Sequence, residues 1–205
     1  MLPSALSVEH STGLIDVALT SAHRSLIADS ACVCEYRSMA NEITRRDFMN
    51  GARSTMHTYQ KLSDLQALTG SILGTSEWLS IDQARIDQFA VVTGDDQWIH
   101  VDPVRAAAGP FGTTVAHGHL TLSLLPVMVR TAFKVADVRM TVNYGLNRVR
   151  FPAPVPVGSR LRGHFKLMSF EPIPGGAQVV VEVTSEREGH SKPVCVAESV
   201  ARHFV

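Results

Sequence analysis

Residues 118–133 read GHLTLSLLPVMVRTAF, and this stretch decides the fold because apolar residues cover most of the circumference of the helix it predicts. A helix that is apolar on most sides is typical of one enclosed by other structure. Pro126 lies inside the stretch, removes one backbone donor and should kink the helix. The apolar positions are Leu120, Leu122, Leu124, Leu125, Val127, Met128, Val129 and Phe133. The sequence therefore predicts a long, buried central helix.

Downstream of Ala136 the apolar residues change from helical spacing to alternation, as β-strands require. The alternation runs over residues 138–144 and resumes in the opposite phase at 149–151, which predicts a bulge near residues 145–148. Three further strands are predicted at 161–170, 178–186 and 194–204. Helices followed by a run of antiparallel strands predict an α+β domain, in which a curved sheet covers one buried helix.

Upstream of the central helix, helix-start signals occur at three places. Ser63-Asp64-Leu65-Gln66 and Ser80-Ile81-Asp82-Gln83 have capping-box spacing, and the second of these helices should end at Gly94. Asp102-Pro103 is typical of an N-cap followed by the first residue of a short helix over 104–108. Residues 95–101 are therefore expected on a turn that directly follows a helix end.

That turn carries the residues most suited to chemistry. Residues 89–100 read FAVVTGDDQWIH, and they place the Asp95 carboxylate and the His100 imidazole five positions apart. Addition of water to an enoyl thioester needs a base, an acid and hydrogen-bond donors for the developing oxyanion. Asp95 and His100 can supply the first two, and the free backbone N–H groups at the start of the Gly118 helix can supply the third.

These segments resemble the hydratase motif of MaoC-like proteins and R-specific enoyl-CoA hydratases, in which Gly-Asp, a spacer and His precede an apolar segment and His-Gly. Residues 58–205 resemble the mycobacterial-type single-domain members of that family. The resemblance rests on residues 97–103 (QWIHVDP), 106–114 (AAAGPFGTT) and 143–152 (NYGLNRVRFP). One departure is Gln97-Trp98, which stands where the broader motif has Asn-Pro.

The resemblance implies a hot-dog fold, a homodimer and an acyl-CoA thioester substrate whose product is (R)-3-hydroxyacyl-CoA. It assigns Asp95 and His100 as the catalytic pair and Gly118 as the residue whose backbone N–H polarises the thioester carbonyl. We also expect substrate contacts from Gln97, His119 and Asn147. No cofactor beyond the coenzyme A of the substrate and no metal are expected.

Other readings of the same residues stay open. The fold could serve thioester hydrolysis, or it could bind acyl-CoA without reaction. Asp96 is the rival carboxylate, although the spacing to His100 favours Asp95. A metal site of Asp95, His100, His117 and His119 is conceivable, but His-Gly-His at a helix start is not a dependable ligand pattern. His117 is expected to be structural.

Bulk composition excludes several classes of protein. The chain has 205 residues, 45% of them hydrophobic, so it can bury a sizeable core. With 19 basic and 19 acidic residues it has no net charge, which argues against nucleic acid or a membrane as partner. Its three cysteines form no disulfide framework, so a cytoplasmic protein is predicted. Residues 1–55 are predicted to be an N-terminal extension, flexible or outside the domain, and residues 56–205 the domain itself.

Overall fold

The computed structural model describes residues 56–205, which belong to one compact unit. The predicted extension over residues 1–55 lies outside the described residues. In chain order the elements are β1 (His57–Tyr59), η2 (Leu62–Leu68), β2 (Ile72–Thr75), β3 (Leu79–Ser80), α3 (Gln83–Thr93), α4 (Trp98–Val101), α5 (Pro103–Ala107), α6 (Gly118–Ser123), α7 (Leu125–Ala132), β4 (Phe133–Val135), β5 (Met140–Arg150), β6 (Arg160–Ile173), β7 (Gly176–Arg187) and β8 (Cys195–Phe204).

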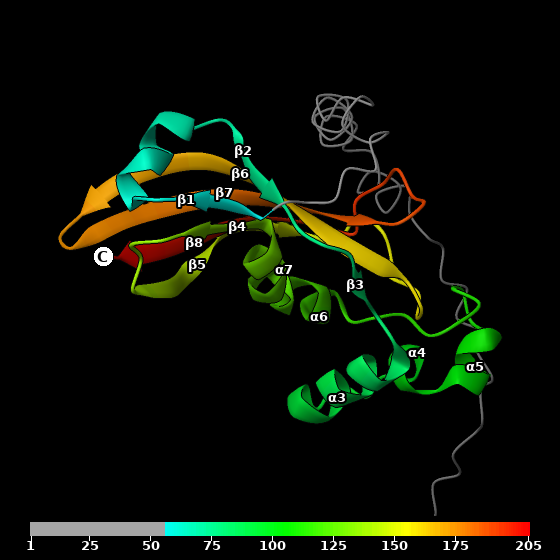
Figure 1. Ribbon diagram of the computed structural model, residues 1–205. Helices are drawn as coiled ribbons and strands as arrows, with labels where there is room; N and C mark the ends of the chain where they lie inside the picture. The colour runs from blue at the N-terminus through cyan, green and yellow to red at the C-terminus, as the bar shows by residue number, and fades with distance from the viewer. Residues whose placement is uncertain (1–55) are drawn as a thin grey trace, which may run out of the picture. The chain divides into compact units, whose positions relative to one another are not determined.

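The main sheet is antiparallel, with strand order β2-β6-β7-β8-β5, and the short strand β3 also pairs with β6. Helices α6 and α7 lie against one face of this curved sheet, and α3, α4 and α5 gather beyond one of its ends (Figure 1). A separate parallel pair joins β1 to β4. This arrangement is the α+β fold predicted from the sequence, in which a curved antiparallel sheet covers the central helix.

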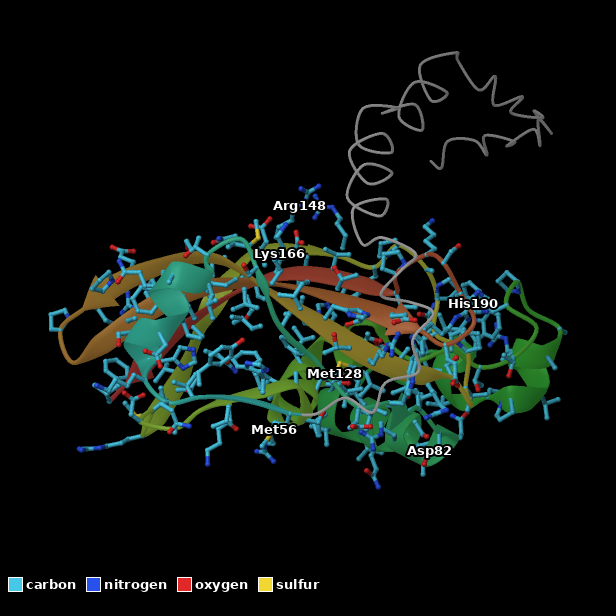
Figure 2. The ribbon with its side chains drawn as sticks, turned by 45° about the horizontal axis from the view of Figure 1, so that its top comes forward. Met56, Asp82, Met128, Arg148, Lys166 and His190 are labelled. Atoms are coloured by element: carbon cyan, nitrogen blue, oxygen red, sulfur yellow. The ribbon has the colours of Figure 1, made fainter. Side chains whose placement is uncertain are left out.

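The core lies between the sheet and the central helices. On β6 and β7 the side chains alternate, and the inward positions are almost fully buried. They pack with Met128 of α7, which lies in the interior, whereas Arg148 of β5 projects outward (Figure 2). The buried apolar residues of the two strands are Leu161, Phe165, Leu167, Ala177, Val179, Val181 and Val183.

The central helix is divided into two segments at Leu124. Pro126 occupies the first turn of α7, where a backbone N–H would have no partner within the helix, so the missing donor costs nothing. The next residue, Val127, donates its N–H to the Leu124 carbonyl oxygen. Phe133, expected as the last helical residue, begins β4 instead. The kink predicted at Pro126 is therefore present as a break between α6 and α7.

Two other local predictions are confirmed, and two helix starts are corrected. Register shifts between β5 and β8 occur at Asn143/Gly145 and Leu146/Arg148, where the sequence predicted a bulge. Helix α3 ends at Gly94 in the left-handed conformation, with φ of 72°. Its N-cap, however, is Asp82 instead of Ser80, and η2 begins at Leu62, just ahead of the predicted Ser63 cap.

Candidate active site

The loop between α3 and α4 holds Asp95 at the surface and delivers His100 to the interior. Gly94 turns the chain at the end of α3, a conformation that favours glycine because it lacks a Cβ. Directly after it, the Asp95 side chain is 55% exposed. The short helix α4 then carries His100 inward, so that only 7% of this residue is exposed.

The His100 ring is fixed in one tautomer by its hydrogen bond. Nδ1 lies 2.6 Å from the Val115 carbonyl oxygen. Because a carbonyl oxygen only accepts, Nδ1 carries the proton and donates it, which leaves Nε2 of the neutral ring with a free lone pair. Burial lowers the pKa of His100 below its ordinary value, against the opposing effect of this hydrogen bond. A neutral ring with an open Nε2 is suited to accept a proton near pH 7.

His117 lies directly against both of these residues. It is 2% exposed, and its ring stacks on that of His100 with centroids 3.7 Å apart and planes 25° apart. Its Nε2 lies 2.9 Å from the Asp95 backbone oxygen and 4.0 Å from the Asp95 carboxylate. Phe89 contacts its ring from α3, with centroids 5.0 Å apart. A residue expected to be merely structural thus bridges the two proposed catalytic groups.

Asp95, His100 and His117 form one cluster, in which a side-chain ligand atom of each lies within 4.8 Å of the others. These are the residues that could hold a metal ion; His119, which the sequence had suggested as a fourth ligand, is exposed elsewhere. The two imidazoles stack almost face to face, so their lone pairs run side by side instead of converging as tetrahedral ligands do. The geometry favours acid–base chemistry.

Gln83 ties the helix that precedes the site to the segments that carry it. Its side-chain amide donates to the His100 carbonyl oxygen at 2.8 Å and to Asp87 at 2.7 Å. Its amide oxygen accepts from the Thr114 hydroxyl at 2.6 Å. Nothing in the sequence singles out Gln83 for the site, because a glutamine in the first turn of a helix carries no signal of contacts with residues far along the chain.

A cavity of about 330 Å³ opens beside His100. Gly118 and Thr121 of α6 also line it, and the rest of its wall is almost entirely apolar. Pockets of this kind, apolar with a few convergent polar groups, are typical of small-molecule sites. The apolar lining residues are Ile99, Phe111, Val115, Ala116, Phe151, Pro152, Ala153, Pro154, Val155 and Val194.

Gly118 is required at its position by the Phe151 ring. A Cβ built on Gly118 would lie 2.9 Å from Phe151 Cδ2, closer than side-chain carbons approach one another. The absence of that Cβ lets an aromatic ring close over the start of α6 and form part of the cavity wall. Gly118 is itself one of the residues that line the cavity.

The other predicted contact residues lie apart from this cavity. Gln97, His119 and Asn147 are all exposed, and none of them lines it. Of the three, His119 contacts a residue of the cavity wall: its ring packs edge-on against Phe151, with centroids 5.8 Å apart. The described chain thus brings Asp95 close to His100, and it places His100 and Gly118 in one cavity wall that Asp95 does not line. Gln97, His119 and Asn147 stay at the surface.

Comparisons with known proteins show the family to which the chain belongs. The family model described as "MaoC like domain" matches residues 64–190. The 3-hydroxyacyl-thioester dehydratase Z of Mycobacterium tuberculosis strain H37Rv is 52% identical over 149 residues, which cover 72% of this chain and 99% of the relative. Nodulation protein N of Rhizobium leguminosarum bv. viciae is 47% identical over 140 residues, covering 66% of this chain and 86% of that protein.

A solved structure shares the fold. The unliganded R-hydratase PhaJ1 of Pseudomonas aeruginosa superposes with a TM-score of 0.56 at 22% sequence identity, and the match covers 71% of this chain and 86% of that chain. At this identity the likeness concerns the fold alone, and it confirms the predicted hot-dog architecture.

Proposed function

The chain belongs to the MaoC-like dehydratase family of hydro-lyases, and from that premise we propose that it is an (R)-specific enoyl-CoA hydratase. The reaction adds water to a trans-2-enoyl-CoA and gives an (R)-3-hydroxyacyl-CoA; in reverse it is a dehydration, the activity named for the mycobacterial relative. The proposed R configuration follows the R-hydratase that shares the fold.

One observation carries the proposal: Asp95 and His100 approach each other, and His100 lines an apolar cavity. Their ligand atoms lie within 4.8 Å of each other, a separation that one water molecule can bridge by a hydrogen bond to each. The cavity offers an apolar surface for an acyl chain next to His100.

In the proposed mechanism the water lies between the Asp95 carboxylate and His100 Nε2. His100 Nε2 takes one proton as the oxygen bonds to the β-carbon, and the electron pair of the double bond moves towards the thioester oxygen. The α-carbon then takes a proton from the imidazolium, which restores neutral His100. Asp95 raises the pKa of His100, so it favours the protonated ring formed in the middle of this sequence.

Gly118 is the proposed donor to the thioester oxygen. Its N–H belongs to the first turn of α6, where backbone donors have no partner within the helix. One donor aimed at a developing oxyanion contributes roughly 10²–10³-fold in rate. Gln97, His119 and Asn147 stay proposed contacts for parts of the substrate that extend beyond the cavity.

We propose that the reaction needs no metal and no cofactor other than the coenzyme A of the substrate. A proton acceptor, a proton donor and an oxyanion donor complete the requirements for adding water to a conjugated thioester.

Within residues 56–205, none of the helices has the length and hydropathy needed to span a bilayer. The cytoplasmic location stays a prediction from the sequence.

A homodimer is proposed through β5, which lies at one edge of the sheet. An unpaired edge with apolar side chains favours pairing with a second copy. The four large apolar side chains along this strand are 41–58% exposed, and they are Met140, Val142, Tyr144 and Leu146.

Sedimentation at micromolar concentration should therefore give twice the mass of the 205-residue chain. Val142→Lys places a charge in the proposed interface and should shift the protein towards monomer. Val91→Lys is the matched control, because Val91 lies on α3, is 83% exposed, and should leave the dimer intact. A wild-type protein that sediments only as a monomer would contradict the proposal.

The function itself is tested with crotonyl-CoA and butyryl-CoA. Hydration should remove the enoyl absorbance of crotonyl-CoA, release no free thiol from either compound, and yield (R)-3-hydroxybutyryl-CoA on chiral analysis. Thiol release from both compounds would show a thioesterase instead. Binding of crotonyl-CoA without any conversion would show a non-catalytic acyl-CoA-binding module.

A further inference from the structure

His117 makes a polar contact with the backbone that carries Asp95. Its Nε2 lies 2.9 Å from the Asp95 carbonyl oxygen, and since that oxygen only accepts, Nε2 carries the proton and donates. Asp95 is otherwise a half-exposed residue just after a helix end, and among residues 56–205 its backbone makes one other hydrogen bond, a long one of 3.4 Å between its N–H and Thr93 Oγ1. The hydrogen bond from His117 is therefore the main attachment of Asp95 to the buried part of the domain.

The same ring limits the orientations open to His100. The two imidazoles stack at 3.7 Å between centroids, and Phe89 of α3 also contacts the His117 ring, with centroids 5.0 Å apart. The Val115 carbonyl fixes the Nδ1 side of His100. With one face held by His117 and one edge held by Val115, His100 Nε2 can point in one direction only.

We propose that His117 is a positioning residue for the Asp95 and His100 pair, holding the Asp95 backbone by its Nε2–H and the catalytic imidazole by its ring face. It acts through these two residues and touches no reacting atom. This role rests on the function proposed above, and it goes beyond the structural role that the sequence suggested for His117. One ring thus contacts both partners, and it contributes to the separation between His100 and the backbone that carries the carboxylate.

The two contacts are separable by substitution. His117→Phe keeps an aromatic face against His100 but loses the donor to Asp95, and it removes a buried Nδ1 that has no partner among the described residues. It should therefore fold. His117→Gln keeps an amide donor for the Asp95 carbonyl and loses the stack. Each variant should lower kcat by about 10- to 100-fold, as is typical when a residue that orients an active-site group is removed, with KM for crotonyl-CoA nearly unchanged.

Titration of His100 gives a readout that loss of general stability does not produce. His117 lowers the pKa of His100 by more than Asp95 raises it, so removing the imidazole should raise the pKa of His100 in both variants. These are the ionisable groups of the cluster that face His100. A raised pKa protonates the base at higher pH, so the acid limb of kcat/KM should move to higher pH. Side-chain ¹H–¹⁵N spectra report the same pKa and the Nδ1–H tautomer directly.

His57→Phe and His57→Gln are the matched controls, since His57 is exposed in β1 and should leave kcat and the pH profile as in the wild type. The proposal is overturned if both His117 variants keep wild-type kcat and His100 pKa, or if kcat falls only with the unfolded fraction. If the wild-type protein hydrates no enoyl-CoA, the proposed function fails on its own, while the spectra still show whether His117 sets the pKa and tautomer of His100.

Discussion

Replacing His100 with alanine should reduce kcat for crotonyl-CoA hydration by about 10²–10⁴-fold, the contribution expected of a positioned general base. The effect is large because Nε2 of this buried ring carries the lone pair that accepts the proton, while Nδ1 donates a hydrogen bond to the Val115 carbonyl oxygen. Loss of the ring also leaves the Val115 carbonyl without its partner. That desolvated acceptor costs about 1–3 kcal/mol of stability, so the thermal midpoint should be measured beside the rate.

His100→Gln separates the chemistry from the folding cost. Its amide can donate to Val115 but cannot accept a proton at neutral pH, so it should be as inactive as His100→Ala with a smaller loss of stability. His57→Ala is the control, because β1 lies at the opposite end of the domain from α4 (Figure 1). Turnover close to the wild-type rate in either folded His100 variant would remove His100 from the mechanism.

Replacing Asp95 with asparagine should lower kcat by a similar factor, about 10²–10⁴-fold. The amide has the shape of the carboxylate but no charge, so it is a weaker acceptor for the water and does not stabilise protonated His100. Because the Asp95 side chain is 55% exposed, the free energy of unfolding should hardly change. The rate loss should therefore appear without a loss of structure.

Asp96→Asn is the matched control, since it makes the same change at the adjacent exposed carboxylate. Asp96 is no member of the cluster formed by Asp95, His100 and His117, and the variant should keep wild-type kcat. If Asp96→Asn is inactive and Asp95→Asn is active, the carboxylate assigned from spacing is the wrong one.

The sequence predicted those parts of the fold that depend on local backbone chemistry. Gly94 ends α3 because its left-handed conformation suits glycine, Asp102 accepts from Arg105 N to cap α5, and Pro126 divides the central helix. The bulges of β5 could be predicted because an extra residue in a strand moves the following apolar side chains from odd to even positions, or the reverse. Each of these signals lies within a few residues of the feature it predicts.

The missed elements depend on partners far along the chain. Strand β2 has four residues and exists because it pairs with β6, and β1 exists because it pairs in parallel with β4. Neither is long enough to show a period of its own. The helix start predicted at Ser80 is wrong for a different reason. Ser80 and Asp82 are both residue types that cap helices, but Ser80 belongs to strand β3 and pairs with Arg160 of β6, so Asp82 is the N-cap.

The same limit applies to the candidate site. Asp95 and His100 are close in sequence, so their meeting was predictable from one loop. His117 is 22 residues from Asp95, and Gln83 is 17 residues from His100, so only the fold could reveal their contacts with the pair. The apolar wall beside His100 likewise combines α6 with residues 151–155 that follow β5. Contacts by Gln97, His119 and Asn147 stay predictions, because the cavity of the described chain does not reach them.

Asp95 and His100 are proposed to act together on one water molecule, and a double-mutant cycle measures whether they do. We would measure kcat for crotonyl-CoA hydration with the wild type, Asp95→Asn, His100→Gln and the double variant. Groups that act as a unit give losses that do not add in free energy. We expect the double variant to be about as slow as the slower single variant. A double variant whose loss equals the product of the two single losses would show that Asp95 and His100 act independently.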